Sequence, residues 1–202
     1  MSRYTGSKNK LARRIGEDLG LKANAVKVAN VIANRPGQHG AKNRRKLSDF
    51  GVQLKEKQKL KYIYGLNEGQ LRKVYDIATK NPTATGAAML SLLERRLDNV
   101  VYRLGWSLTR AAARQAVAHS HIQVNGKKMN VPSYAVKVGD VVIVKEKSHK
   151  SPMFADRLTN PTKELPGWLE RQGAAAKVAR FPERQEIREA IEEQLIVEYF
   201  SR

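Results

Sequence analysis

Cysteine is absent from the 202 residues of the chain, and this absence removes several kinds of site at once. Without thiols the protein has no disulfide, no thiolate zinc ligand and no cysteine nucleophile. The four histidines are scattered, and no two stand four residues apart, the spacing of a helical zinc pair. The GxxxxGK[ST] phosphate loop and the GxSxG nucleophile elbow are missing as well. We therefore expect no metal, no cofactor and no enzymatic activity.

Long apolar runs and acidic residues are also scarce. No apolar run approaches the roughly 18 residues that span a bilayer, and the N-terminus lacks the apolar stretch of a secretory signal. The chain has 38 Lys and Arg against 19 Asp and Glu, giving a net charge of +19. Such a charge attracts polyanions, and nucleic acid is a stronger candidate than an anionic membrane. We expect a cytoplasmic protein with no membrane partner.

The charge is unevenly distributed along the chain. Residues 1–64 hold sixteen Lys and Arg against four Asp and Glu, whereas residues 183–199 hold six Glu against two Arg. The basic front end is the expected electrostatic footprint on a nucleic acid. The acidic end either faces a protein partner, through Glu192, Glu193 and Glu198, or neutralises basic groups within the fold.

The first third predicts helices separated by loops. Leu11–Ile15 predicts a short helix, but glycines interrupt residues 1–40, and such basic segments often order only against a partner. A second helix is expected over residues 48–64, with Ser48 as its cap. Its lysines fall on two nearly opposite flanks, Lys55 with Lys59 and Lys57 with Lys61. Two basic flanks suit a helix that lies between RNA strands.

A third helix is expected after Asn67 and Gln70, which stand three residues apart as in a capping box. Pro82 follows its end. Its inward face is expected to hold Leu71, Val74, Tyr75 and Ala78.

Residues 89–147 predict a compact RNA-binding module. An apolar stripe from Leu90 to Leu104 predicts one helix, with Arg95, Asn99, Tyr102 and Arg103 on its other side. Thr109 is expected to cap a second, alanine-rich helix. Arg110 and Arg114 share one face of that helix, one turn apart.

A tight hairpin is expected next, because Asn125-Gly126 is a strong short-range turn signal. The hairpin would hold Lys127 and Lys128 near the two arginines. A basic helix followed by a basic hairpin forms a surface for phosphates, although a run of charge is more often a solvated surface. His119 and His121 either stack on bases or close the helix, and Tyr62, Tyr64 and Tyr102 either stack or pack.

The remainder predicts strands, an irregular segment and a final helix. Residues 134–138 alternate as a strand, and Val141–Val144 read as a buried strand. Residues 148–180 are expected to be irregular, with Trp168 and the following leucine anchored on a neighbour. Ile187, Ile191, Leu195 and Tyr199 trace a helical stripe to the C-terminus.

Five motifs, in order over nearly the whole chain, resemble one known family. Residues 1–6 (Met-Ser-Arg-Tyr-Thr-Gly) are similar to its opening, and residues 36–40 to its Pro-Gly-Gln-His-Gly loop. Residues 46–65 resemble its next helix, residues 94–105 the start of its RNA-binding module, and residues 193–202 its C-terminus. The family is ribosomal protein four of the bacterial small subunit. Some members bind zinc through four cysteines, whereas Asn9 and Ala12 stand where the first pair would fall, so the resemblance is to the zinc-free branch.

The resemblance implies an α+β fold: a mostly helical domain interrupted by a small module of two helices packed on a short, mainly antiparallel sheet. The expected helical domain is 1–88, completed by 181–202, and the inserted module is 89–180, with its core at 92–150. The resemblance also implies direct binding to 16S rRNA at a 5′-domain junction, early assembly of the subunit body, and a contribution to translational accuracy. Ribosomal protein five is the implied protein partner, with ribosomal protein three near the messenger entry channel as a further candidate, and the chain is expected to be a monomer within the small subunit.

The residues expected to contact RNA are mostly basic, with amide, aromatic and turn residues among them. They are Arg3, Tyr4, Arg13, Arg14, Arg35, Gln38, His39, Lys42, Arg44, Arg45, Lys46, Lys55, Lys57, Lys59, Lys61, Tyr62, Arg95, Arg96, Asn99, Arg103, Arg110, Arg114, Gln115, His119, His121, Asn125, Gly126, Lys127 and Lys128.

Two alternative functions remain at this stage. An RNA-modifying enzyme, such as a pseudouridine synthase or a tRNA synthetase, carries a similar module beside a catalytic domain, and a turnover assay would identify it. A regulator that binds messenger RNA is the second alternative, and it is compatible with a ribosomal role.

Overall fold

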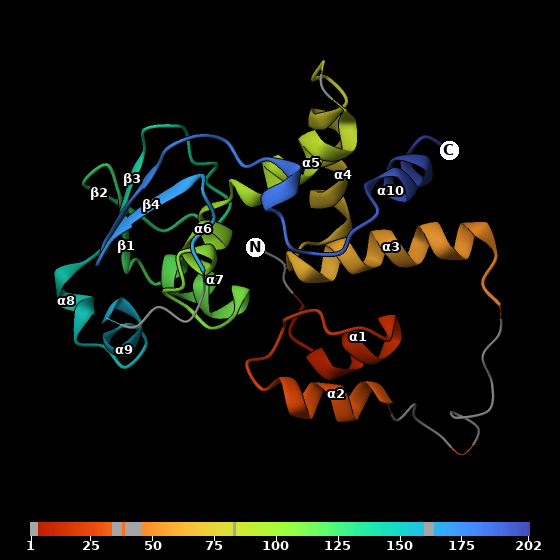
Figure 1. Ribbon diagram of the computed structural model, residues 1–202, viewed down its shortest axis with the longest axis horizontal. Coiled ribbons are helices and arrows are strands. Elements are labelled where there is room, and N and C mark those ends of the chain that lie inside the picture. Colours follow the sequence, from red (N-terminus) through yellow and green to blue (C-terminus); the bar gives the residue numbers. More distant parts are fainter. Residues whose placement is uncertain (1–3, 34–37, 39–45, 83, 160–163) are drawn as a thin grey trace. The chain divides into compact units, whose positions relative to one another are not determined.

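The computed structural model describes residues 4–33, 38, 46–82, 84–159 and 164–202 (Figure 1). The chain divides into two compact units, the first formed by residues 1–86 and 189–202, the second by residues 87–188. The described part of the first unit is helical, whereas the second combines helices with a five-stranded antiparallel sheet. The predicted α+β class is therefore confirmed.

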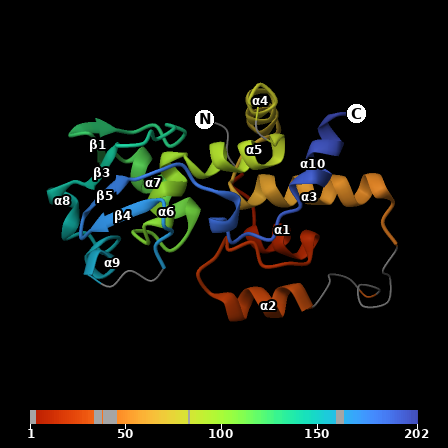
Figure 2. The same ribbon diagram turned by 45° about the horizontal axis from the view of Figure 1, so that its top comes forward.

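The first unit begins with a pair of short helices, α1 (Lys8–Ile15) and α2 (Ala25–Ala33). They pack side by side over a small core that includes Leu11, Ile15 and Val28 (Figure 2). Helix α1 ends at Gly16, whose φ of 82° is accessible to glycine at little cost. The sequence predicted α1 but missed α2, which is rich in β-branched residues.

The next two helices, α3 (Asp49–Ile63) and α4 (Glu68–Ala78), begin at the predicted caps. The hydroxyl oxygen of Ser48 accepts a hydrogen bond from the Gly51 N–H at 3.3 Å. Asn67 and Gln70 form a capping box, in which each side chain accepts from the other residue's N–H, at 2.8 and 3.1 Å. Leu71 and Ala78 are buried, as predicted, whereas the other two residues of that face are half-buried.

The final helix, α10 (Glu193–Phe200), is shorter than predicted. Ile187 and Ile191 are buried but lie before it, after a single 3-10 turn, η1 (Arg184–Glu186). The backbone N–H of Glu192 donates to Glu56 Oε1 of α3 at 3.1 Å. In a longer helix this N–H would donate to a backbone carbonyl of the preceding turn. Helix α10 packs along α3 (Figure 1).

The second unit is built on a sheet with the strand order β2-β1-β3-β5-β4, in which every neighbouring pair is antiparallel. The predicted hairpin is present, and so is the predicted strand at 141–144, of which only alternate residues are buried. A second hairpin joins β4 to β5, so the expectation of irregular structure was wrong for 169–178. The two strands, Leu-Glu-Arg-Gln and Ala-Ala-Lys-Val, lack a regular alternation of apolar and polar residues, so the sequence pattern does not indicate them. The strands are β1 (Ile122–Val124), β2 (Lys127–Met129), β3 (Val141–Val144), β4 (Leu169–Gln172) and β5 (Ala175–Val178).

The long helix predicted over 90–104 is broken into α5 (Thr85–Glu94) and α6 (Leu97–Arg103). Between them Arg96 is extended and forms an isolated β-bridge with Ala135. The Leu97 N–H donates to the Tyr134 carbonyl at 2.8 Å, and the Val136 N–H donates to the Arg95 carbonyl at 2.9 Å. These long-range bonds replace helical ones, and the predicted strand over 134–138 is reduced to that single bridge.

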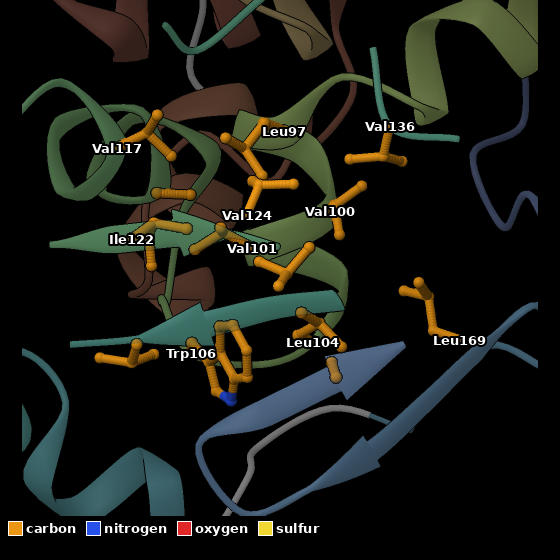
Figure 3. Close-up of a cluster of buried hydrophobic side chains, with 14 of the residues drawn as sticks. Leu97, Val100, Val101, Leu104, Trp106, Val117, Ile122, Val124, Val136 and Leu169 are labelled. Atoms are coloured by element: carbon orange, nitrogen blue, oxygen red, sulfur yellow. The ribbon is translucent and has the colours of Figure 1, made fainter. Parts of the chain in front are cut away.

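Alternate residues of the strands point into one apolar core with α6 and α7 (Arg110–Ala118). Figure 3 shows Leu97, Val101 and Val117 from these helices turned toward Ile122 and Val124 of β1. Trp106 and Trp168 belong to the same cluster, which confirms that the segment around 168 is anchored. Two short helices, α8 (Glu146–His149) and α9 (Ala155–Thr159), precede the second hairpin.

Candidate RNA-binding surface

The β1–β2 hairpin presents the clearest basic surface of the second unit. Asn125 and Gly126 form its two-residue turn with φ values of 51° and 75°, as a tight type I′ turn requires. Lys127 and Lys128 follow at once and are exposed. No ion pair involves either lysine within the described part of the chain. Both ammonium groups are therefore available to anionic ligands.

Helix α7 begins at the predicted cap, where Thr109 Oγ1 accepts from the Ala112 N–H at 3.2 Å. Its two arginines, however, turn toward the module. Arg110 is only 9% exposed, donates from Nε to Asn99 Oδ1 at 2.8 Å, and lies over the Tyr102 ring. Arg114 Nη1 lies 3.5 Å from Asp98 Oδ2. Direct phosphate contact by these arginines stays a prediction.

A buried charged network connects the helices of the second unit. Glu94 is 1% exposed and accepts two hydrogen bonds from Arg103, at 2.7 and 2.8 Å. The amide of Asn99 donates to the same carboxylate at 2.7 Å while accepting from Arg110. A parallel bidentate pair joins Arg96 to Asp98. Asn99, expected on a polar outer face, is thus buried as a structural residue.

The two basic flanks of α3 have the predicted orientation, but acidic side chains occupy both. Lys57 and Lys61 both contact Glu68 of α4, the latter at 3.0 Å. On the other flank Lys59 Nζ lies 2.7 Å from Glu17 Oε2, and Lys55 Nζ lies 3.9 Å from the same carboxylate. Although burial lowers the pKa of Lys59, hydrogen bonds with its acidic partners raise it above the ordinary value. In this conformation both lysine flanks of α3 form ion pairs with carboxylates of the protein, in the place where the sequence predicts RNA phosphates.

Glu68 gives the first unit a pH-dependent stability. Burial raises its pKa, but hydrogen bonds from Lys57 and Lys61 outweigh that effect and hold it below 4.5. The ion pairs therefore stabilise the folded state above about pH 4.5, and the contribution is lost as the pH falls through the lowered pKa. Since the carboxylate is half-exposed, we expect Glu68→Gln to cost about 0.5–1 kcal/mol at pH 7 and almost nothing near pH 3.

Far-UV circular dichroism during urea unfolding measures this difference, with Asp76→Asn, an exposed carboxylate on the same helix, as the control. A cost of the same size at both pH values would contradict the assignment.

The other expected contacts have varied environments. Arg95 donates from Nε to the Val136 carbonyl and lies over the Phe181 ring, and burial lowers its pKa. His121 Nδ1 lies 2.9 Å from Ser148 Oγ, and its pKa is lowered by burial and then by the charges of His119 and Lys145. Arg13 donates to the Val31 carbonyl and Arg14 to the Tyr62 hydroxyl. The exposed residues among the remaining expected contacts are Tyr4, Gln38, Lys46, Gln115 and His119.

The expected contacts that lie outside the described residues are Arg3, Arg35, His39, Lys42, Arg44 and Arg45.

The acidic end of the chain is used partly within the fold. Glu198 Oε2 accepts from Gln53 Nε2 at 2.9 Å, and the side chain of Glu193 lies against Gly86, where an added Cβ would approach it to 2.6 Å. In the second unit Arg180 contacts both Glu183 and Glu186. Neutralisation of a basic group within the fold therefore occurs, while Glu192 remains exposed.

Among the described residues, no group of three or more His, Asp or Glu side chains could hold a metal ion. None of the helices described is both long and apolar enough to cross a membrane. The chain is strongly basic, has an α+β fold and exposes two lysines on a hairpin. These features are typical of the class of RNA-binding proteins.

Comparison with known proteins identifies the family. Residues 3–94 match the ribosomal protein S4/S9 N-terminal domain, and residues 95–142 match the S4 domain. The small ribosomal subunit protein uS4 of Brevibacillus brevis is 49% identical, and that of Herpetosiphon aurantiacus is 50% identical, each over the full length of both chains. The uS4 protein of Parabacteroides distasonis is 47% identical, again over both full lengths. The chain belongs to the uS4 family of small ribosomal subunit proteins, whose members are structural proteins and not enzymes.

Proposed function

We propose that the chain binds 16S rRNA directly at a helical junction of the 5′ domain and nucleates assembly of the subunit body. It acts as a monomer in the cytoplasmic small subunit, where it contributes to translational accuracy. The exposed lysine pair on a well-defined hairpin carries the proposal, because phosphate contacts supply most of the affinity of such proteins. Shape and 2′-hydroxyl contacts then select the junction.

The expected RNA contacts divide into two groups by their environment. Exposed groups, including Lys127, Lys128 and Gln115, reach the RNA directly. Buried groups, including Arg110 and Asn99, support binding by fixing the helices that carry the surface, and their own contact with RNA requires them to become exposed. Both groups belong to the proposed site.

A protein partner is proposed for the end of the first unit formed by α3 and α10. Phe50 is half-exposed and stacks at a tilt on Tyr199, with 5.7 Å between the ring centroids. The Arg202 guanidinium lies over the Phe50 ring, and Glu192 adds an exposed carboxylate on the same unit. Partly exposed aromatic rings flanked by charged groups of both signs suit a protein surface that also carries both signs of charge. We propose ribosomal protein five as this partner, with ribosomal protein three as a further neighbour.

Equilibrium binding to two RNAs tests the proposal. The purified chain is titrated with a 5′-domain fragment of 16S rRNA and with an unrelated structured RNA of equal length, at one physiological salt concentration. We expect a preference of about a hundredfold, or roughly 2.8 kcal/mol. Equal affinities would mean that the net charge of +19 binds any RNA, and the proposed junction site would be wrong.

A further inference from the structure

Asn125 makes more contacts than its turn requires. Its Nδ2 donates to Asp140 Oδ1 at 2.9 Å, and its Oδ1 accepts from the Val141 N–H at 2.9 Å. Its own backbone N–H donates to the Val141 carbonyl at 2.8 Å. One residue at the tip of the β1–β2 hairpin therefore makes two hydrogen bonds with Val141, the first residue of β3, and one with Asp140, the residue before it. We call this set of three residues the Asn125 bridge.

The far side of the bridge is itself fixed. Asp140 is 8% exposed, and its second oxygen accepts from the Lys137 N–H at 2.8 Å and lies 3.4 Å from the Tyr134 hydroxyl. Burial, and then Asp140, raises the pKa of Tyr134, so its hydroxyl remains protonated and able to donate. The adjacent Gly139 has a φ of 89°, which sets the turn that presents Asp140 to the hairpin.

The hairpin needs such support. Strand β2 lies at the edge of the sheet and, among the residues that the structure describes, pairs with β1 alone, through three residues. A hairpin of this length is marginally stable by itself. Lys127 and Lys128 stand on β2, so motion of this strand would disperse their charges. The Asn125 bridge joins the tip of the hairpin to the central strands and limits that motion.

We propose that Asn125 and Asp140 are positioning residues that hold the lysine pair in the geometry used for RNA. The proposal rests on the proposed function, in which these lysines contact rRNA. Asn125 also permits a positive φ, and turn geometry alone would explain its presence. Glycine permits the same φ but lacks the amide, so Asn125→Gly separates the two roles.

The experiment uses the full chain and two measurements. Amide hydrogen exchange of residues 127–129 reports hairpin order without RNA, and titration with the 5′-domain fragment reports affinity. We expect Asn125→Gly to accelerate the exchange and to weaken the affinity, each about tenfold, from the loss of two side-chain hydrogen bonds. Asn125→Asp, which places a carboxylate against Asp140, is expected to have a larger effect on both. Asn130→Gly, a change at an exposed asparagine just after β2, is the matched control and should alter neither beyond about twofold.

The outcomes distinguish this proposal from the proposed function. Unchanged exchange in Asn125→Gly would overturn the bridge as a structural support. Faster exchange with unchanged RNA affinity would overturn its positioning role, provided that the double variant Lys127→Ala/Lys128→Ala does weaken binding. If the lysine variant also binds normally, the proposed function of the hairpin fails as well. The emission of Trp106 and Trp168, both buried in this unit, verifies that each variant remains folded.

Discussion

Replacing Glu94 with alanine is expected to destabilise the second unit by about 3–5 kcal/mol, because it removes a buried carboxylate that accepts hydrogen bonds from a largely buried guanidinium and a buried amide. Glu94 accepts both hydrogen bonds of the Arg103 fork and one from the Asn99 amide. The carboxylate is 1% exposed, so in the folded chain these donors depend on it and not on bulk water. The substitution removes one charge and leaves, of these contacts between α5 and α6, the bond from the Asn99 amide to the backbone carbonyl of residue 94.

Urea unfolding followed by tryptophan emission measures this loss. The two tryptophans of the chain, Trp106 and Trp168, both lie in the core of the second unit, so their signal reports that unit alone. The control is Glu170→Ala, which removes an exposed carboxylate from β4 in the same unit and should change the free energy of unfolding by less than about 0.5 kcal/mol. Similar values for the two variants would mean that the network does not support the fold.

The sequence predicts features whose signals lie within a few residues. Ser48, Thr109 and the Asn67–Gln70 box each act across three positions, and all form as expected. The Asn125-Gly126 turn is equally local. Helix periodicity also places the lysines of α3 correctly on opposite flanks. In each case the energy depends on groups that the chain brings together at short range.

Features that depend on distant partners are not predictable in this way. The helical spacing of apolar residues continues from Leu93 to Leu97 and predicts an unbroken helix. Backbone hydrogen bonds with residues 134 and 136 nevertheless interrupt the helix between these two leucines. Glu17 and Glu68 reach the lysines of α3 from other elements, so the helix looks like a free basic surface in sequence. The same limitation affects Arg110 and Arg114, whose i, i+4 spacing reveals a shared face but not the direction in which it points.

The salt dependence of RNA binding distinguishes exposed from buried cations, and it gives the second large effect. We expect the double variant Lys127→Ala/Lys128→Ala to lower the slope of log K against log salt by about 1.4–1.8, the value for two phosphate contacts. At 0.1 M salt the same loss corresponds to a decrease in affinity of at least about tenfold. Both side chains are exposed, so the stability of the second unit should stay unchanged.

The matched comparison is Arg110→Ala/Arg114→Ala, which removes the same charge from α7. If these arginines only hold Asn99 and Asp98, the variant lowers the tryptophan unfolding midpoint and leaves the salt slope unchanged. If they contact phosphates, as their spacing alone predicts, the slope falls as far as it does for the lysine variant. The positions of both guanidinium groups favour the first result, because Arg110 is only 9% exposed and the side chain of Arg114 only 12% exposed, which limits the access of a phosphate to their remaining N–H groups. A slope lowered by both pairs would mean that α7 rearranges when RNA binds.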